Sequence, residues 1–145
     1  MKEYYTIPIN FKQLSKGQEL PKCNLYQSMA QRIHMVLVTR QKEFRYDLEF
    51  GSSIWENDFE NVPNLNLWKE KTAKSIADVL NKNEKRLERI SVKIEISQEE
   101  FSQGVNNEVK RIKRRLDIAV EGYVSKTNEP FFFKESIYVS PVWLD

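Results

Sequence analysis

The sequence predicts an α+β fold, in which a mostly antiparallel sheet of three to four strands carries two main helices packed on one face. Three observations predict it. Two stretches before residue 84 repeat apolar residues every three or four positions, which is helical spacing. Stretches after residue 88 alternate apolar and polar residues, as half-buried strands do. The resulting order of strand, helix, extended segment, helix and three strands indicates one helical layer on one sheet.

Length and composition indicate a single domain, residues 1–145, around one core. The chain is 40% hydrophobic and holds only four glycines and five prolines, which is the composition of a packed globule. Its net charge of +2 is too small to attract the whole molecule to nucleic acid or anionic lipid. Cys23 is the only cysteine, which excludes an internal disulfide, and we interpret it as a small apolar filler.

The N-terminal residues MKEYYTIPIN lack the basic start, apolar stretch and cleavage site of a secretory signal. No uninterrupted apolar run exceeds four residues, whereas a membrane helix needs about 20. We therefore expect a cytoplasmic protein without direct membrane insertion.

Apolar and polar residues alternate in the N-terminal segment, as they do in a short strand. Its apolar positions are Tyr5, Ile7, Ile9 and Phe11, and Pro8 places the strand at a sheet edge. Gly17 and Pro21 then indicate a turn.

Two amphipathic helices follow. The first begins after Asn24, a suitable N-cap, and its apolar stripe comprises Leu25, Met29, Ile33, Val36, Leu37 and Arg40. The only histidine, His34, lies within it, and a hydrogen-bonded structural role is favoured over a base or metal ligand because no second ligand is suitably spaced. The second helix has a stripe of Leu65, Trp68, Thr72, Ile76, Val79 and Leu80, and its C-terminus is expected at residues 81–83.

The last third of the chain predicts three strands. Ile90, Val92, Ile94 and Ile96 form one face of the first strand, and a polar loop is expected at residues 98–108. The second strand presents Leu116, Ile118, Val120 and Val124, and these two strands can pair antiparallel. A turn at residues 125–130 leads to the third strand at 131–140, after which residues 141–145 leave the sheet.

No catalytic, cofactor-binding or metal-binding residues emerge, so we do not expect an enzyme. Acidic residues cluster at Asp47, Glu49, Glu56, Asp58 and Glu60, but Arg45 keeps Asp47 ionised and removes the raised pKa that a glycosidase acid requires. Ser52 and Ser53 follow Gly51 without the second glycine of a nucleophile elbow. There is no phosphate-binding or metal-ligand spacing.

The one basic run, Lys110 to Arg115, has three readings. A solvated edge that prevents self-association is preferred, protein docking is second, and nucleic-acid binding is third because the weak net charge provides no supporting field.

Two motifs resemble a known family. The segment FRYDLEFGSSIWE follows a helix ending in Thr39, and its Phe44, Arg45, Tyr46, Asp47, Phe50, Gly51 and Ser52 fit an arginine-aromatic-aspartate stretch ending in Phe-Gly-Ser. Glu84, Lys85 and Arg86 stand where the family has Glu-Pro-Arg, so the proline alone is missing. Over about residues 7–124 the chain therefore resembles the baseplate-wedge family of contractile injection machines, shared by contractile phage tails and type VI secretion baseplates (the TssE-like subunit).

The resemblance implies a structural protein that docks onto a helical bundle of larger wedge proteins and starts sheath assembly by strand sharing with sheath subunits. A type VI secretion origin is preferred over a phage tail. Some members carry a lysozyme label, which these residues do not support. Partner-binding residues are then expected to be Glu84, Lys85, Arg86, Arg45, Tyr46, Asp47, Phe50 and Gly51, and the edge for strand sharing is either the N-terminal strand or the last one.

Several alternatives stay open at this stage. Glu84 and Arg86 can bind a partner, or they can close their turn as an intramolecular ion pair. If they bind a partner, alanine at either position should leave the fold intact and abolish assembly. Phe44, Tyr46 and Phe50 can anchor on the core or on a partner, with Arg45 and Asp47 orienting the segment. The other functions considered are a stand-alone regulatory binding module and, least favoured, a peptidoglycan hydrolase.

Overall fold

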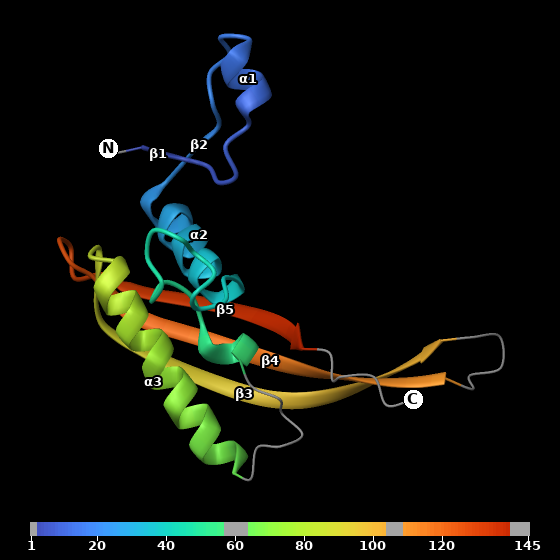
Figure 1. Ribbon diagram of the computed structural model, residues 1–145. Helices are drawn as coiled ribbons and strands as arrows, with labels where there is room; N and C mark the ends of the chain where they lie inside the picture. The colour runs from blue at the N-terminus through green and yellow to red at the C-terminus, as the bar shows by residue number, and fades with distance from the viewer. Residues whose placement is uncertain (1–2, 57–63, 104–108, 140–145) are drawn as a thin grey trace.

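The computed structural model describes residues 3–56, 64–103 and 109–139 (Figure 1). Its architecture is α+β, as predicted, with a three-stranded antiparallel sheet, two long helices on one side of it, and a small two-stranded sheet near the N-terminus. The elements in chain order are β1 Tyr4–Tyr5, α1 Phe11–Ser15, β2 Lys22–Cys23, α2 Leu25–Val38, η1 Ser53–Glu56, α3 Leu65–Asn83, β3 Leu87–Gln103, β4 Val109–Val124 and β5 Pro130–Val139.

The main sheet has the order β3-β4-β5, and each strand pairs antiparallel with the next. Ile94, Ile118 and Glu135 form one row across it, and their side chains face the helices. The side chains of neighbouring rows, such as Lys93 and Lys134, are exposed on the opposite face. The alternation predicted for all three strands therefore separates a core side from a solvent side.

The predicted loop at residues 98–108 is wrong over its first six residues. β3 continues to Gln103, and its partners run from Gln98 opposite Arg114 to Gln103 opposite Val109. The polar composition suggested a loop, but pairing of backbone groups along a long hairpin satisfies them whatever the side chains are. Residues 104–108 lie outside the described residues.

The core lies between the sheet and the two helices, and both predicted helices are present. Asn24 caps α2 through a capping box with Gln27, and the side chain of Asn64 accepts a hydrogen bond from the Leu67 N–H at the start of α3. All buried positions of both helices belong to the predicted stripes. Three predicted members are not buried: Leu25 is half-buried, Leu65 is exposed, and Arg40 lies beyond the end of α2 and is exposed. No helix in the described ranges is long and apolar enough to cross a bilayer.

Side-chain contacts fasten α2 to the last strand. The hydroxyl of Tyr26 donates to the carbonyl oxygen of Phe132, 2.5 Å away, and its ring packs on Phe131. Two turns further along, Nδ1 of His34 and a carboxylate oxygen of Glu135 are 2.5 Å apart. His34 therefore has the structural, hydrogen-bonded role expected from the sequence.

The predicted N-terminal strand over Tyr5 to Phe11 is mostly wrong. β1 is only two residues long and pairs with β2, away from the main sheet. The side chain of Asn10 accepts hydrogen bonds from the backbone N–H groups of Lys12 and Gln13, so this residue starts the short helix α1 where the alternation suggested strand. Cys23 is buried and its thiol contacts the Tyr5 carbonyl, which fits the predicted apolar filler.

We predict that Ile118→Ala lowers the free energy of unfolding by about 2–5 kcal/mol, because the side chain is fully buried at the centre of β4. Chemical denaturation measures this. Phe132→Ala, which removes a half-exposed ring from the outer face of β5, is the control and should change stability by less than about 1 kcal/mol. Equal effects at the two positions would contradict the assignment of inner and outer faces.

Candidate docking surface

The segment from Arg40 to Ser52 is a loop closed at its base by a glycine. Arg40 and Ser52 form a parallel bridge, in which the N–H of Ser52 donates to the Thr39 carbonyl over 2.8 Å. Gly51 has φ +124°, and a Cβ at this position would lie 2.6 Å from the Thr39 carbonyl oxygen. Only glycine allows this conformation and this close approach, which gives a physical reason for the Phe-Gly-Ser motif.

The loop's carboxylates hold its backbone in place. The Arg40 N–H donates to the carboxylate of Glu43 at 2.9 Å, and the Glu49 N–H donates to Asp47 at 3.1 Å. The Lys42 N–H bonds the Leu48 carbonyl at 2.8 Å, which closes the inner turn. These acids therefore satisfy local donors, as short polar side chains do in turns.

The three aromatic side chains of the loop differ in how far they are exposed to solvent. Phe50 is half-buried against the core, Phe44 packs on Phe50 with ring centroids 5.7 Å apart, and Tyr46 packs edge-on to Phe44 at the same distance. The side chain of Tyr46 is 85% exposed. Among the described residues no ion pair joins Arg45 to Asp47, and the Asp47 carboxylate instead accepts a hydrogen bond from the Glu49 N–H. One ring thus anchors the loop while another faces solvent.

The turn from α3 to β3 carries a paired charge. The carboxylate of Glu84 is 2% exposed and accepts two hydrogen bonds of 2.7 Å from Nε and Nη2 of Arg86. It also accepts the backbone N–H of Arg86 at 3.1 Å, and Arg86 Nη1 donates to Ser28 Oγ at 2.9 Å. The hydrogen bonds from Glu84 raise the pKa of the Arg86 guanidinium above its usual value, so the guanidinium stays charged.

This geometry matches the intramolecular ion pair that the sequence left open. The Glu84 carboxylate faces inward and is not available to another chain, whereas Arg86 keeps about 30% of its side chain exposed and Lys85 is exposed. Because Glu84 is buried and satisfies three donor groups, its replacement by alanine changes the stability of the turn. We therefore expect such a variant to be less stable, whereas the sequence alone suggested an intact fold.

Helix α2 brings the two motifs together. Ser28, which bonds Arg86, and Arg32, whose guanidinium lies 5.9 Å from the centre of the Phe50 ring, are four residues apart and share one face of the helix. At the end of α3, Lys82 Nζ lies 2.5 Å from the Glu49 carboxylate of the loop. Loop 40–52, Arg32 and the Glu84–Arg86 turn thus form one continuous area, which we call the docking surface.

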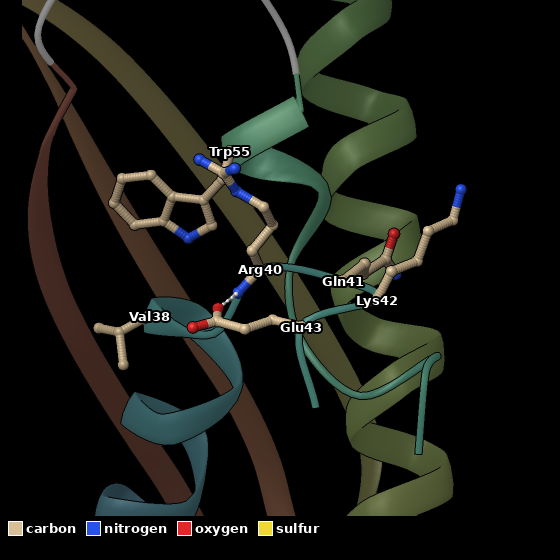
Figure 2. Close-up of a pocket in the computed structure, with 6 residues that line it drawn as sticks. All are labelled: Val38, Arg40, Gln41, Lys42, Glu43 and Trp55. Atoms are coloured by element: carbon tan, nitrogen blue, oxygen red, sulfur yellow. Dashed lines mark hydrogen bonds between the residues drawn. The ribbon is translucent and has the colours of Figure 1, made fainter. Parts of the chain in front are cut away.

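A shallow hollow of about 740 Å³ lies at the end of α2 beside this loop (Figure 2). Its lining includes Trp55, whose indole N–H donates to the carbonyl of Leu37 and so satisfies one acceptor at the end of α2. The other lining residues come from the end of α2 and the first residues of the loop: Val38, Arg40, Gln41, Lys42 and Glu43. In Figure 2 the Arg40 side chain extends toward Trp55, and the dashed line joins the backbone N–H of Arg40 to the Glu43 carboxylate. The sequence reasoning did not identify this hollow.

The structure describes the side chains of only part of the basic run. Arg115 bonds Asp117 at 2.9 Å, and a hydrogen bond from Ser136, followed by this contact, lowers the pKa of the Asp117 carboxyl. Arg115 therefore has an acidic neighbour along its own strand. It is paired with Ser97 of β3 and Tyr138 of β5, so the expected edge position is wrong for this end of the basic run. The side chains of residues 110–113 lie outside the described residues, as do Asp58 and Glu60 of the acidic cluster. The described residues contain no group of three His, Cys, Asp or Glu that could hold a metal ion.

Comparisons with known proteins concern the family and the fold of the chain. Residues 23–129 match the family model described as baseplate wedge protein gp25. A crystal structure from Geobacter sulfurreducens, whose provisional name is tail lysozyme, is similar in fold, with a TM-score of 0.57 and 21% sequence identity. The similarity covers 86% of this chain and all of that one. No curated protein is significantly similar in sequence.

We predict that Gly51→Ala destabilises the protein by at least about 2 kcal/mol, since the new methyl group would collide with the Thr39 carbonyl at a strained φ. Gly17→Ala is the matched control. Gly17 also has positive φ, at +70°, but nothing lies within 4 Å of a Cβ there, so the cost should be about 1 kcal/mol. Thermal or chemical unfolding of both variants tests the role of close approach.

We further predict that Arg86→Ala lowers stability by about 2–4 kcal/mol, because it leaves the buried Glu84 carboxylate without its paired charge. Arg86→Lys should fall between this variant and the wild type, because lysine lacks the bidentate fork. Lys85→Ala, at an exposed neighbour, should change stability by no more than about 0.5 kcal/mol. If Arg86→Ala unfolds like Lys85→Ala, the pair does not stabilise the turn.

Proposed function

Since the chain belongs to the family of baseplate wedge protein gp25, and is on that basis a component of a contractile-tail baseplate, we propose that it is a wedge adaptor of the type VI secretion kind. In this proposal it docks onto larger wedge proteins through the docking surface and starts sheath assembly from its main sheet. It works in the cytoplasm, where a baseplate has access to sheath subunits. It catalyses no reaction.

One observation carries the docking proposal: the two motifs, about 35 residues apart in sequence, meet across one face of α2. Each motif is held together by its own contacts. The close approach at Gly51 closes the loop, and the Glu84–Arg86 pair closes the turn. The side chain of Tyr46 and part of the Arg86 side chain remain exposed to solvent. Aromatic rings and arginine are the side chains most enriched where protein interfaces gain their binding energy.

The state of the acidic residues supports a structural role over hydrolysis. Glu43, Asp47 and Glu49 each bond a backbone N–H or a lysine of the same chain. A glycosidase needs one carboxyl group kept protonated in an apolar setting and a second one across a cleft. The loop carboxylates are instead exposed or half-exposed and engaged as acceptors in turns.

The main sheet offers edges for strand sharing. In the described part of the chain β5 and β3 each have a strand neighbour on one side only, whereas the expected N-terminal strand pairs with β2 and is not part of this sheet. Helix α3 packs against β3, whereas the specific contacts of α2 with β5 among the described residues lie at Phe131, Phe132 and Glu135. We therefore favour β5 as the edge that receives a sheath strand.

We predict that Tyr46→Ala weakens binding to the larger wedge proteins of the same baseplate at least tenfold and leaves stability unchanged, because the ring is almost fully exposed. Tyr138→Ala, which removes a half-exposed ring from the outer sheet face, is the matched control and should bind normally. Surface plasmon resonance with the purified wedge proteins measures both. Equal affinity of all three proteins would contradict the docking surface, and peptidoglycan turnover by the wild type that is lost in Asp47→Asn would contradict the non-enzymatic role.

A further inference from the structure

Arg89 has a backbone conformation that arginine rarely adopts. It lies in a β-bulge, where the register between β3 and β4 moves from Glu88 opposite Tyr123 to Ser91 opposite Glu121. Its φ of +52° is in the left-handed region, which disfavours every residue with a Cβ, so glycine is the usual residue at such a position. Residues held in disfavoured conformations concentrate at functional sites. The side chain of Arg89 therefore needs an explanation that its backbone preference does not provide.

The bulge sets Arg89 apart from the alternation of its strand. Leu87 before it is buried and Ile90 after it packs against the core, so Arg89 is the extra residue between two inward positions, and it is exposed. Gly122 on β4 makes room for the bulge, because a Cβ there would lie 3.1 Å from the Glu88 carbonyl oxygen. The bulge thus keeps the Arg89 side chain out of the core.

Two contacts hold the guanidinium of Arg89 in place. Its Cζ lies 4.0 Å from the centre of the Tyr123 ring, and its Nη2 donates to Oδ1 of Asn128 at 2.5 Å. Asn128 belongs to the turn between β4 and β5, where its N–H donates to the Val124 carbonyl over 2.8 Å. Figure 1 shows this turn at the end of the sheet where α3 leads into β3. The planar group is therefore ordered before any partner binds, which lowers the entropic cost of binding.

The charge of this guanidinium is not neutralised within the described part of the chain. Its hydrogen-bond partner there, the Asn128 amide, is neutral, and no described carboxylate forms an ion pair with it. The acidic residues of the neighbouring strands and turn, Glu88, Glu121 and Glu129, are all exposed. A run of phosphates, as in nucleic acid, would be repelled by these three carboxylates, whereas one anionic group reaches Arg89 alone. The free edge of the guanidinium therefore fits a single anionic group.

From these observations we propose that Arg89 binds a carboxylate of another protein, an aspartate or glutamate side chain that meets the free edge of the guanidinium. Two N–H groups of the planar fork match the two oxygens of a carboxylate, and the Tyr123 ring shields one face of the pair from water. The partner is one of the larger wedge proteins, so its identity rests on the proposed function. Arg89 was not among the partner-binding residues expected from the sequence.

The test compares the full-length wild type with Arg89→Gly, using the purified larger wedge proteins as the probe. We expect Arg89→Gly to bind them at least about tenfold more weakly. Arg89→Lys should also bind more weakly than the wild type, because lysine keeps the charge but lacks the fork. Lys126→Ala, which removes an exposed cation of the neighbouring turn, is the matched control and should bind like the wild type. Added salt should weaken binding of the wild type more than that of Arg89→Gly.

Melting temperatures separate binding from a structural role of Arg89. Glycine removes the contacts with Tyr123 and Asn128 but also relieves the left-handed strain, so Arg89→Gly should melt within about 4 °C of the wild type. Arg89→Ala removes the same contacts and keeps the strain, so it should melt below Arg89→Gly. A melting temperature of Arg89→Gly far below that of the wild type would assign Arg89 to the stability of the bulge and overturn the proposal.

The binding outcomes separate this proposal from the wedge function. If Arg89→Gly binds like the wild type while Tyr46→Ala binds weakly, the Arg89 proposal is wrong and the proposed function stands. If the wild type binds none of the larger wedge proteins, the proposed function fails, and the partner assigned to Arg89 fails with it. Calorimetric titration with inorganic phosphate is the remaining arm. Phosphate binding by the wild type that Arg89→Gly abolishes would identify a site for a free anion and overturn the protein carboxylate.

Discussion

The ion pair between Glu84 and Arg86 holds the two layers of this protein in their relative positions. It lies where α3 ends and β3 begins, and its guanidinium also reaches Ser28 on α2 and Tyr4 on β1. Removing a carboxylate from water is costly, and it is offset here because both oxygens are engaged by a bidentate fork and by a backbone N–H. The pair therefore links the start of β3 to α2 and to β1.

The loop of residues 40–52 depends on a steric constraint of a different kind. Its two ends approach so closely at Gly51 that a methyl group does not fit, and the carboxylates inside the loop replace the hydrogen bonds that a regular element would provide. A loop built in this way presents its outer rings in one orientation. Rigid presentation lowers the entropic cost of binding, because the side chains near the loop are already ordered before the partner arrives.

Under the proposed function, the residues that stabilise the loop and the turn are also part of the docking surface. The Glu84–Arg86 turn is held by internal hydrogen bonds and leaves only part of the Arg86 side chain exposed. Under the proposed function, substitutions in it are expected to affect both folding and binding, whereas substitution of an exposed residue such as Tyr46 affects binding alone. Under the proposed function, the contact surfaces keep their geometry only while the domain is folded.

The sequence by itself determined the secondary structure of α2, α3 and the three long strands, because hydrophobic periodicity and local caps such as Asn24 and Asn64 act over a few residues. It also identified Gly51 and the charged turn through their motifs. The tertiary structure alone decided that Glu84 turns inward, that loop 40–52 and the turn meet across α2, and that β3 extends to Gln103. Burial, close approach and strand pairing each depend on residues far apart in the chain. The alternation that predicts a strand at Tyr5 to Phe11 yields only the two-residue β1, because β2 pairs with Tyr4 and Tyr5 alone.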